Sequence, residues 1–400
     1  MKIKGLFIIG WISALSCLTG ASAMKAQAAF ATAPNKPISV NVYALLNTSV
    51  VESNNNPTAG GRRGDDLVVG GYGLCCGSFT GISGAADFGG GLGGVFQVET
   101  GFLLDRGTLE DQGQIFGRQA YVGFTSKVGP VFNVISIGRQ YGPAFAATAP
   151  LDPYAHGAQF PSAWDCFIFG VSFDNSLQDV VTIGHSKIMF SYSPGGIPGS
   201  SGSGTSTGAG AVYVASSFLF AGTVVHSQDA TKHSLDVYGG GVRYTHKALN
   251  LFSYYFDTLR DPDFGDTGTG QGPPAGTSEP LANTDLALNL GNTLQRKDHY
   301  ANGAVRYDLK KQYSLIGMYK FDSARQVNSA GQHGTATTYL GEFARGISPE
   351  FFVYGFAAYT RLTGAEIAGD QNNPNGSFGG ANARAYGGIG INYRFTLALK

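Results

Sequence analysis

The chain has 400 residues, of which only 14% are charged, and its formal net charge is +0. Ordinary globular proteins carry roughly 25% charged residues, and a neutral chain without basic runs lacks the electrostatic signature of a nucleic-acid-binding protein. The 60 glycines, 27 phenylalanines and 20 tyrosines suit a transmembrane β-barrel, in which outward aliphatic residues meet lipid and aromatic residues mark the interfaces. Composition alone leaves a soluble β-sandwich or β-solenoid open.

The first 23 residues are predicted to be a secretory signal peptide. Lys2 and Lys4 form a positive start, residues 5–18 an apolar core, and Ala21-Ser22-Ala23 a small-residue cleavage site. Cleavage after Ala23 is the first choice and after Ala28 the second. An uncleaved membrane anchor is the weaker interpretation, because the core is shorter than a spanning helix. The exported chain, residues 24–400, is predicted to be a single domain.

The two ends of the mature chain show the clearest strand patterns. Apolar and polar residues alternate with a period of two over residues 38–50 and again over residues 386–399. In the last strand one face holds Ile389, Ile391, Tyr393, Phe395, Leu397 and Leu399, and the other holds Asn392, Arg394, Thr396 and Lys400. A regular strand at the end of the chain predicts closure onto the first strand, because lipid does not tolerate an open sheet edge.

Between these ends, hairpins with short turns alternate with long loops. Residues 303–309 and 314–321 form one predicted hairpin, with Val305 and Tyr307 on one face and Arg306 and Asp308 on the other. Long Gly-, Asn- or Pro-rich loops are predicted at residues 194–210, 257–298, 322–336 and 363–384. Short turns at one end and long loops at the other indicate an antiparallel up-and-down membrane barrel.

One long segment, residues 143–165, shows neither strand alternation nor a helical period. A loop of this length inside a compact domain is usually functional or disordered, and we expect it to fold into the barrel mouth and set the bore. The first of the two predicted strands before this segment is ambiguous, because neither face of residues 116–124 has a lipid-facing pattern. Contact with another subunit or a different register would explain that pattern.

Motifs for catalysis or cofactors carry little weight. Gly89, Gly91 and Gly94 match a dinucleotide-binding spacing, but no helix follows, so a turn between strands is preferred. Residues 204–208 spell a nucleophile-elbow pattern inside a Ser/Gly tract, without the strand–turn–helix context that it needs. No histidine or cysteine spacing predicts a metal site. A disulfide between Cys166 and the Cys75–Cys76 pair is left open.

Several segments together resemble the trimeric general porins of the Gram-negative outer membrane. The resemblance rests on VNVYALLN, DFGGGLGGVFQVETGFLLDRG (87–107), FGRQAYVGF (116–124), IGRQYGP (137–143), the late hairpins and the terminal Arg394-Phe395. It implies an outer-membrane location, about 16 antiparallel strands, a homotrimer in lipid, and a third loop folded inward. It also implies passive diffusion of ions and small hydrophilic solutes, with no enzymatic activity, cofactor or nucleic acid.

In such porins, acidic residues on the third loop face basic residues on the opposite wall. By this resemblance the pore constriction consists of Arg118, Asp152 and Asp165. A structural salt bridge is the alternative for Arg118, and a loop-anchoring acceptor role is the alternative for both acids. Where family members carry basic residues before the DFGGGL segment, this chain has Phe79-Thr80 and Ser83, which implies fewer cations in the constriction.

Three other functions are weighed against a diffusion pore. A substrate-specific channel for sugars or carboxylates would use aromatic or basic tracks, which the many tyrosines allow. An outer-membrane hydrolase needs a nucleophile, base and acid on one rim, and no Ser/His/Asp pattern supports one. An adhesive β-protein is favoured only if the chain is soluble without detergent.

Overall fold

The computed structural model describes residues 38–58, 62–70, 77–110, 113–154, 170–197, 199–200, 202–265, 289, 291–309, 312–367 and 380–399. These residues form one antiparallel sheet of eighteen strands. Two of them, β2 (Arg63–Gly70) and β5 (Thr108–Leu109), are short additions at one rim. The remaining sixteen are β1 (Ile38–Pro57), β3 (Ser78–Gly89), β4 (Leu92–Leu103), β6 (Gln119–Val128), β7 (Val131–Tyr141), β8 (Ser172–Ile183), β9 (Ser186–Ser193), β10 (Ser206–Ala215), β11 (Phe218–Gln228), β12 (Ser234–His246), β13 (Leu249–Arg260), β14 (Arg296–Leu309), β15 (Tyr313–Arg325), β16 (Gly334–Gly346), β17 (Phe351–Gly364) and β18 (Ala383–Leu399).

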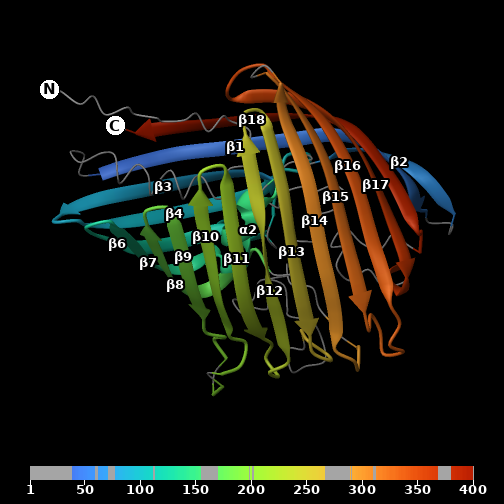
Figure 1. Ribbon diagram of the computed structural model, residues 1–400, viewed down its shortest axis with the longest axis horizontal. Helices are drawn as coiled ribbons and strands as arrows, with labels where there is room; N and C mark the ends of the chain where they lie inside the picture. The colour runs from blue at the N-terminus through green and yellow to red at the C-terminus, as the bar shows by residue number, and fades with distance from the viewer. Residues whose placement is uncertain are drawn as a thin grey trace.

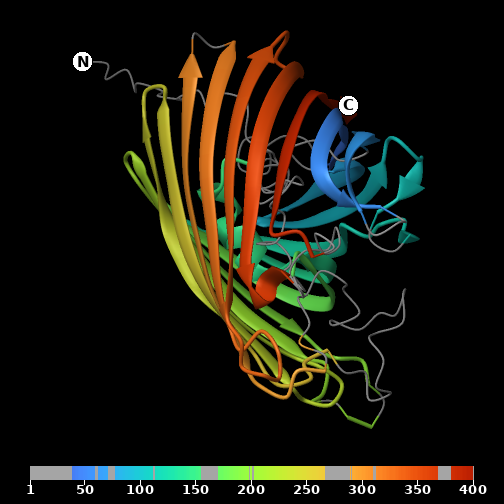
Figure 2. The same ribbon diagram turned by 90° about the vertical axis from the view of Figure 1, so that its right-hand side faces the viewer.

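The sheet closes on itself through its first and last long strands. Pairing between β1 and β18 runs from Val40 opposite Leu399 to Ser53 opposite Tyr386, and β1 also pairs with β3. In Figures 1 and 2, β1 and β3 run steeply across the direction of β12–β16, as expected for tilted strands on different sides of a barrel. The predicted all-β membrane barrel with about 16 strands, closed by the last strand, is confirmed.

Side chains alternate along the strands in the order expected of a membrane protein. Val122, Ile137 and Ile389 point outward and are 65%, 62% and 69% exposed, whereas Asn47 and Gln97 point inward and are fully buried. A soluble sheet would bury the apolar face instead. In β6, Val122 and Phe124 also point outward and are 65% and 47% exposed, so this strand has an apolar outer face that suits either lipid or contact with another subunit.

Connections are short at one end of the barrel and mostly long at the other. The β3–β4 turn uses Gly89, Gly90 and Gly91, all with positive φ, which glycine adopts without steric penalty. At the opposite end, long segments join β7 to β8, β13 to β14 and β17 to β18, whereas β11 and β12 are joined by only a few residues. The loop predicted at 194–210 is shorter than expected, because β10 begins at Ser206.

The predicted constriction loop begins with a helix that the sequence pattern did not indicate. Pro143–Thr148 form α2, with proline in the first turn, and Ala149–Leu151 form the 3₁₀ helix η2. In Figure 1, α2 lies behind β10–β12, on the inner side of the wall. Within the described residues, no helix is both long and apolar enough to span a membrane. The predicted signal peptide and Cys75, Cys76 and Cys166 lie outside the described residues.

The outward face of β18 allows a direct test of its lipid exposure. Ile391 lies in the middle of the strand and Leu397 lies near the short-turn end, and both point outward. Ile391→Lys is expected to lower the free energy of unfolding by about 2–4 kcal/mol, and Leu397→Lys by about 0–1 kcal/mol, because the cost of a charge depends on depth in the bilayer. Guanidinium unfolding in lipid vesicles measures both values. Equal losses would contradict the proposed bilayer position.

Candidate functional site: the barrel lumen and its inward loop

The first half of the inward loop is held by apolar packing. Ala144 and Ala147 are fully buried in α2, and Phe145 is 4% exposed. Phe145 and Leu151 share a cluster with inward-facing residues of β11 to β14, among them Leu219, Val225, Leu235, Tyr254 and Tyr300. Burying a side chain such as Phe145 or Leu151 contributes about 1.5–3 kcal/mol. The helix is therefore fixed to the wall by its own side chains.

Asp152 anchors the next part of the loop. Its Oδ1 accepts a hydrogen bond from the backbone N–H of Tyr154 at 2.7 Å, which closes a local turn. Its Oδ2 accepts from the Tyr254 hydroxyl at 3.2 Å and from Asn302 Nδ2 at 3.3 Å, and Lys320 Nζ lies 4.0 Å away. With only 4% of Asp152 exposed, these are the contacts expected of a loop-anchoring acceptor. They bind the loop to β13, β14 and β15.

Tyr154 makes a second polar contact two residues later. Its hydroxyl donates to Glu342 Oε2 on β16 at 3.3 Å. Burial, together with the nearby Glu342 carboxylate, raises the pKa of the Tyr154 hydroxyl well above its ordinary value, so this group stays protonated and keeps donating. Arg243 on β12 adds a hydrogen bond to the Pro150 carbonyl at 3.4 Å. Residues 150–154 are thus tied to five consecutive strands, β12 to β16.

Aromatic ladders line the inner wall where this segment lies. Phe352, Tyr354 and Phe356 follow one another on β17 with ring centroids 6.0 and 6.3 Å apart. They belong to one apolar cluster with Ala149 and Tyr154 of the loop and are only 4–8% exposed. These rings therefore pack against other protein atoms and do not form an exposed track along the lumen.

Arg118 lies just before β6 and is held in a polar cluster on another part of the wall. Its Nε donates to Glu99 Oε1 at 2.8 Å and its Nη2 donates to the Tyr141 hydroxyl at 2.9 Å. Tyr43 also donates to Glu99, at 2.7 Å, and the guanidinium carbon lies 4.5 Å from the Phe79 ring centre. Two hydrogen bonds and a cation–π contact fix its orientation.

Arg118 and Asp152, two of the three predicted constriction residues, lie in separate clusters. Arg118 is held by residues of β3, β4 and β7, whereas Asp152 is held by residues of β13, β14 and β15. Asp165 lies outside the described residues. A role of these residues in one pore constriction therefore stays a prediction.

A further charged cluster lies at the loop ends of β13 and β14. Arg296 Nη2 donates to Asp298 Oδ1 and to Glu366 Oε1, both at 2.8 Å, and Arg260 pairs with Asp298. All four side chains are fully buried. Glu366 belongs to the 3₁₀ helix η3 (Ala365–Ile367), so this cluster ties the β17–β18 connection to the wall. Removing one partner of such a buried pair typically costs several kcal/mol.

Comparison with known proteins identifies the family. A sequence profile described as Gram-negative porin matches residues 14–365. The chain belongs to the Gram-negative porin family. An outer-membrane location as a β-barrel follows from this membership.

An outer membrane porin protein of Bordetella pertussis (strain Tohama I) is 30% identical to this porin over 140 residues, which are 32% of this chain and 35% of that protein. The match thus spans about a third of that relative's length.

Solved structures share the fold. The anion-selective porin from Comamonas acidovorans aligns with a TM-score of 0.68 at 16% identity, covering 90% of this porin and 100% of that chain. OmpT of Vibrio cholerae aligns with a TM-score of 0.60 at 12% identity, covering 90% and 98%. Salmonella typhi OmpF, solved with daunomycin, aligns with a TM-score of 0.59 at 13% identity, covering 90% and 97%.

Sequence reasoning missed the wall residues that hold the loop of this porin. Lys320 and Glu342 point inward from β15 and β16, among Ile316, Met318 and Leu340. The signal was available in part, because a charged residue next to apolar residues on the inward face of a strand indicates a buried partner. The partner itself could not be named from the chain alone. Among the described residues, no group of three His, Cys, Asp or Glu side chains could hold a metal ion.

The Asp152–Lys320 contact can be measured by a double-mutant cycle. Asp152→Ala removes an acceptor from a fully buried site, and Lys320→Met removes the facing charge while keeping an apolar chain of similar length. The double variant is expected to lose less free energy of unfolding than the two single variants together, by about 1 kcal/mol or more, because neither charge then remains buried without the other. The free energy of unfolding is measured in detergent for the unchanged protein, the two single variants and the double variant. Losses that add within about 0.3–0.5 kcal/mol would show that the two residues act independently.

Proposed function

We propose that this porin is an outer-membrane channel through which ions and small hydrophilic solutes diffuse passively in a water-filled pore. The observation that carries this proposal is a closed sixteen-strand barrel, apolar outside, with a loop segment fixed across the inner faces of β12 to β16. A barrel of this strand number leaves an aqueous lumen. A loop fixed against one wall narrows that lumen without needing a moving part.

Selectivity in such a pore arises from width and from fixed charge. Arg118, Asp152 and Asp165 are our proposed constriction residues. Glu99 neutralises much of the field of Arg118, and the contacts of Asp152 neutralise part of its own. We therefore expect moderate selectivity that depends on ionic strength, because screened charges act over about 10 Å at 0.1 M salt.

A substrate-specific channel for sugars or carboxylates is the second candidate. Rows of aromatic residues on β13 and β17 favour it, since successive rings along a wall can guide a solute. Their burial against the inward loop assigns these rings to packing, so general diffusion remains the preferred function. We propose no enzymatic reaction, no cofactor and no nucleic-acid partner for this chain.

We further propose that the porin assembles as a homotrimer in outer-membrane lipid. Structural neighbours include an OmpT structure described as a trimer form, which supports the proposal by fold alone. Analytical ultracentrifugation in detergent is expected to give a protein mass three times that of one chain, and heating is expected to reduce it to a single chain. A single-chain mass for protein that still conducts would contradict the trimer.

Single-channel recording in a planar bilayer under a salt gradient tests the channel and the role of Arg118 together. Refolded porin is expected to insert in conductance steps that come in threes. Arg118→Glu should shift the reversal potential toward cation preference, because it reverses a lumenal charge beside Glu99. Arg345→Glu is the matched control, since Arg345 points outward from β16.

Two outcomes of the recording would count against the proposals. An unchanged reversal potential in Arg118→Glu would remove Arg118 from the constriction. Folded protein without any conductance would overturn the diffusion channel.

A further inference from the structure

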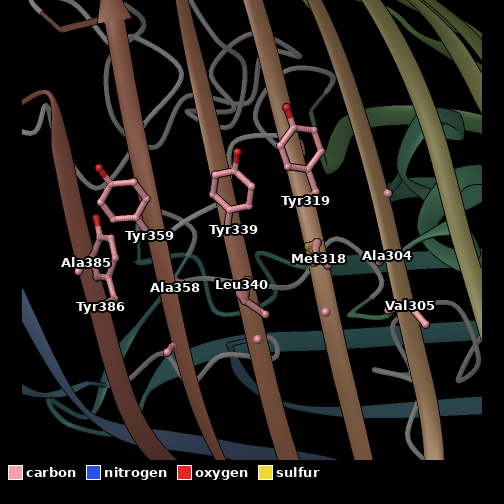
Figure 3. A pocket seen from close by; sticks show the side chains of 14 residues that line it. Ala304, Val305, Met318, Tyr319, Tyr339, Leu340, Ala358, Tyr359, Ala385 and Tyr386 are labelled. Atoms are coloured by element: carbon pink, nitrogen blue, oxygen red, sulfur yellow. The ribbon is translucent and has the colours of Figure 1, made fainter.

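An apolar groove lies on the outer face of the barrel over β14–β18. It has a volume of about 760 Å³ and is lined by residues of five neighbouring strands, including Gly317, Gly341, Ala357 and three tyrosines. Figure 3 shows Tyr319, Tyr339 and Tyr359 side by side on β15, β16 and β17, with their hydroxyl groups pointing the same way, toward the long-loop ends of these strands. The three rings are 41%, 53% and 43% exposed.

The strand register places the groove directly beside these tyrosines. Tyr319 pairs with Tyr339, which pairs with Tyr359, and in the next outward row Gly317 pairs with Gly341, which pairs with Ala357. Small residues beside large rings create the depression. A Cβ atom added at Gly341 would meet no other atom within 4 Å. Contacts with the rest of the protein therefore do not require glycine there, and the space above it is open to a ligand.

Basic residues follow the tyrosines toward the long-loop end. Arg361 lies two residues beyond Tyr359 on the same face of β17, about 7 Å further along the strand. Its side chain is exposed. Arg325 and Lys297 point outward near the corresponding ends of β15 and β14, where they oppose each other. The outward positions of β14–β17 in the described residues include no Asp or Glu.

We propose that this groove is a binding site for an anionic, phosphate-bearing lipid of the leaflet at the long-loop end. One acyl chain lies over Gly317, Gly341 and Ala357. The tyrosine hydroxyls lie at the level of the ester or amide linkages, and Arg361 binds the phosphate through charge-assisted hydrogen bonds. Cation, hydroxyl and apolar groove follow one another in the same order as headgroup, linkage and chain in a lipid.

The charge and the polarity of the surface select a lipid over a second copy of the chain. A protein partner would have to match a row of basic residues at one end of an apolar face, whereas every anionic lipid supplies both properties in one molecule. Long loops lie on the outer side of outer-membrane barrels, so the lipid belongs to the outer leaflet. The site depends on the barrel and its membrane position and is independent of whether the lumen conducts.

Native mass spectrometry of the folded porin, released from detergent after incubation with bisphosphorylated lipid A, tests the site. Gly341→Phe places a ring in the groove at a position where an added Cβ meets no protein atom within 4 Å, and a phenylalanine suits a strand. Arg361→Gln removes the cation. Arg361→Gln is expected to lower lipid retention about tenfold, as for the loss of one hydrogen bond to a charged group. Gly341→Phe is expected to lower it to a similar extent, because its ring takes the place of several CH₂ groups of the acyl chain. Arg345→Gln is the matched control, because this outward cation on β16 lies over Tyr313 at 5.8 Å, toward the short-turn end.

Unchanged retention in Gly341→Phe would overturn the groove as the site. Equal losses in Arg345→Gln and Arg361→Gln would show general attraction to charge and would also overturn it. If Gly341→Phe lowers the number of chains per particle and leaves lipid retention intact, the groove holds a second copy.

A change of electrophoretic mobility on heating establishes that each variant is folded. If Gly341→Phe does not fold, Ala357→Leu is used in its place. Conductance of the same variants is expected to stay unchanged, which separates this test from that of the channel.

Discussion

Backbone amide and carbonyl groups inside a bilayer must find partners within the protein, because an unpaired group in hydrocarbon costs several kcal/mol. In this porin that requirement is met by the pairing of β1 with β18, which continues over fourteen residue positions from Val40 to Ser53. Closure in turn fixes the direction of every side chain. Once the sheet is a ring, one parity of each strand must face lipid and the other must face the lumen.

The lumenal face then serves two purposes. On β1, β4 and β6 it carries polar residues such as Asn47, Gln97 and Gln119, all nearly or fully buried, and the side chains of Asn47 and Gln97 are hydrogen-bonded. On β13 to β17 it carries a mixture of apolar and charged residues on which the loop after β7 lies. The barrel thus encloses a small hydrophobic core of its own. Polar contacts of Asp152 and Tyr154 determine which position the loop takes on that apolar wall.

Strand alternation made the fold largely predictable from the sequence. Val305 and Tyr307 face outward and Arg306 faces inward, as the period of two indicated. The interior of the loop was not predictable in the same way, because α2 has only six residues and is too short to show a helical period. The partners of Asp152 are 102, 150 and 168 positions away in the chain, and no local pattern connects such positions.

Arg118 and Lys320 illustrate why residue type alone does not assign a role within a pore. Both are lumenal cations, yet Arg118 is oriented by Glu99, Tyr141 and Phe79, while Lys320 is almost fully buried beside Asp152. A charge acts on a passing ion only to the extent that its field is not cancelled by a neighbour or screened by water. Arg118, with 14% of its side chain exposed, keeps contact with the lumen. Lys320, with 1% exposed, is shielded from the lumen and faces Asp152 of the inward loop.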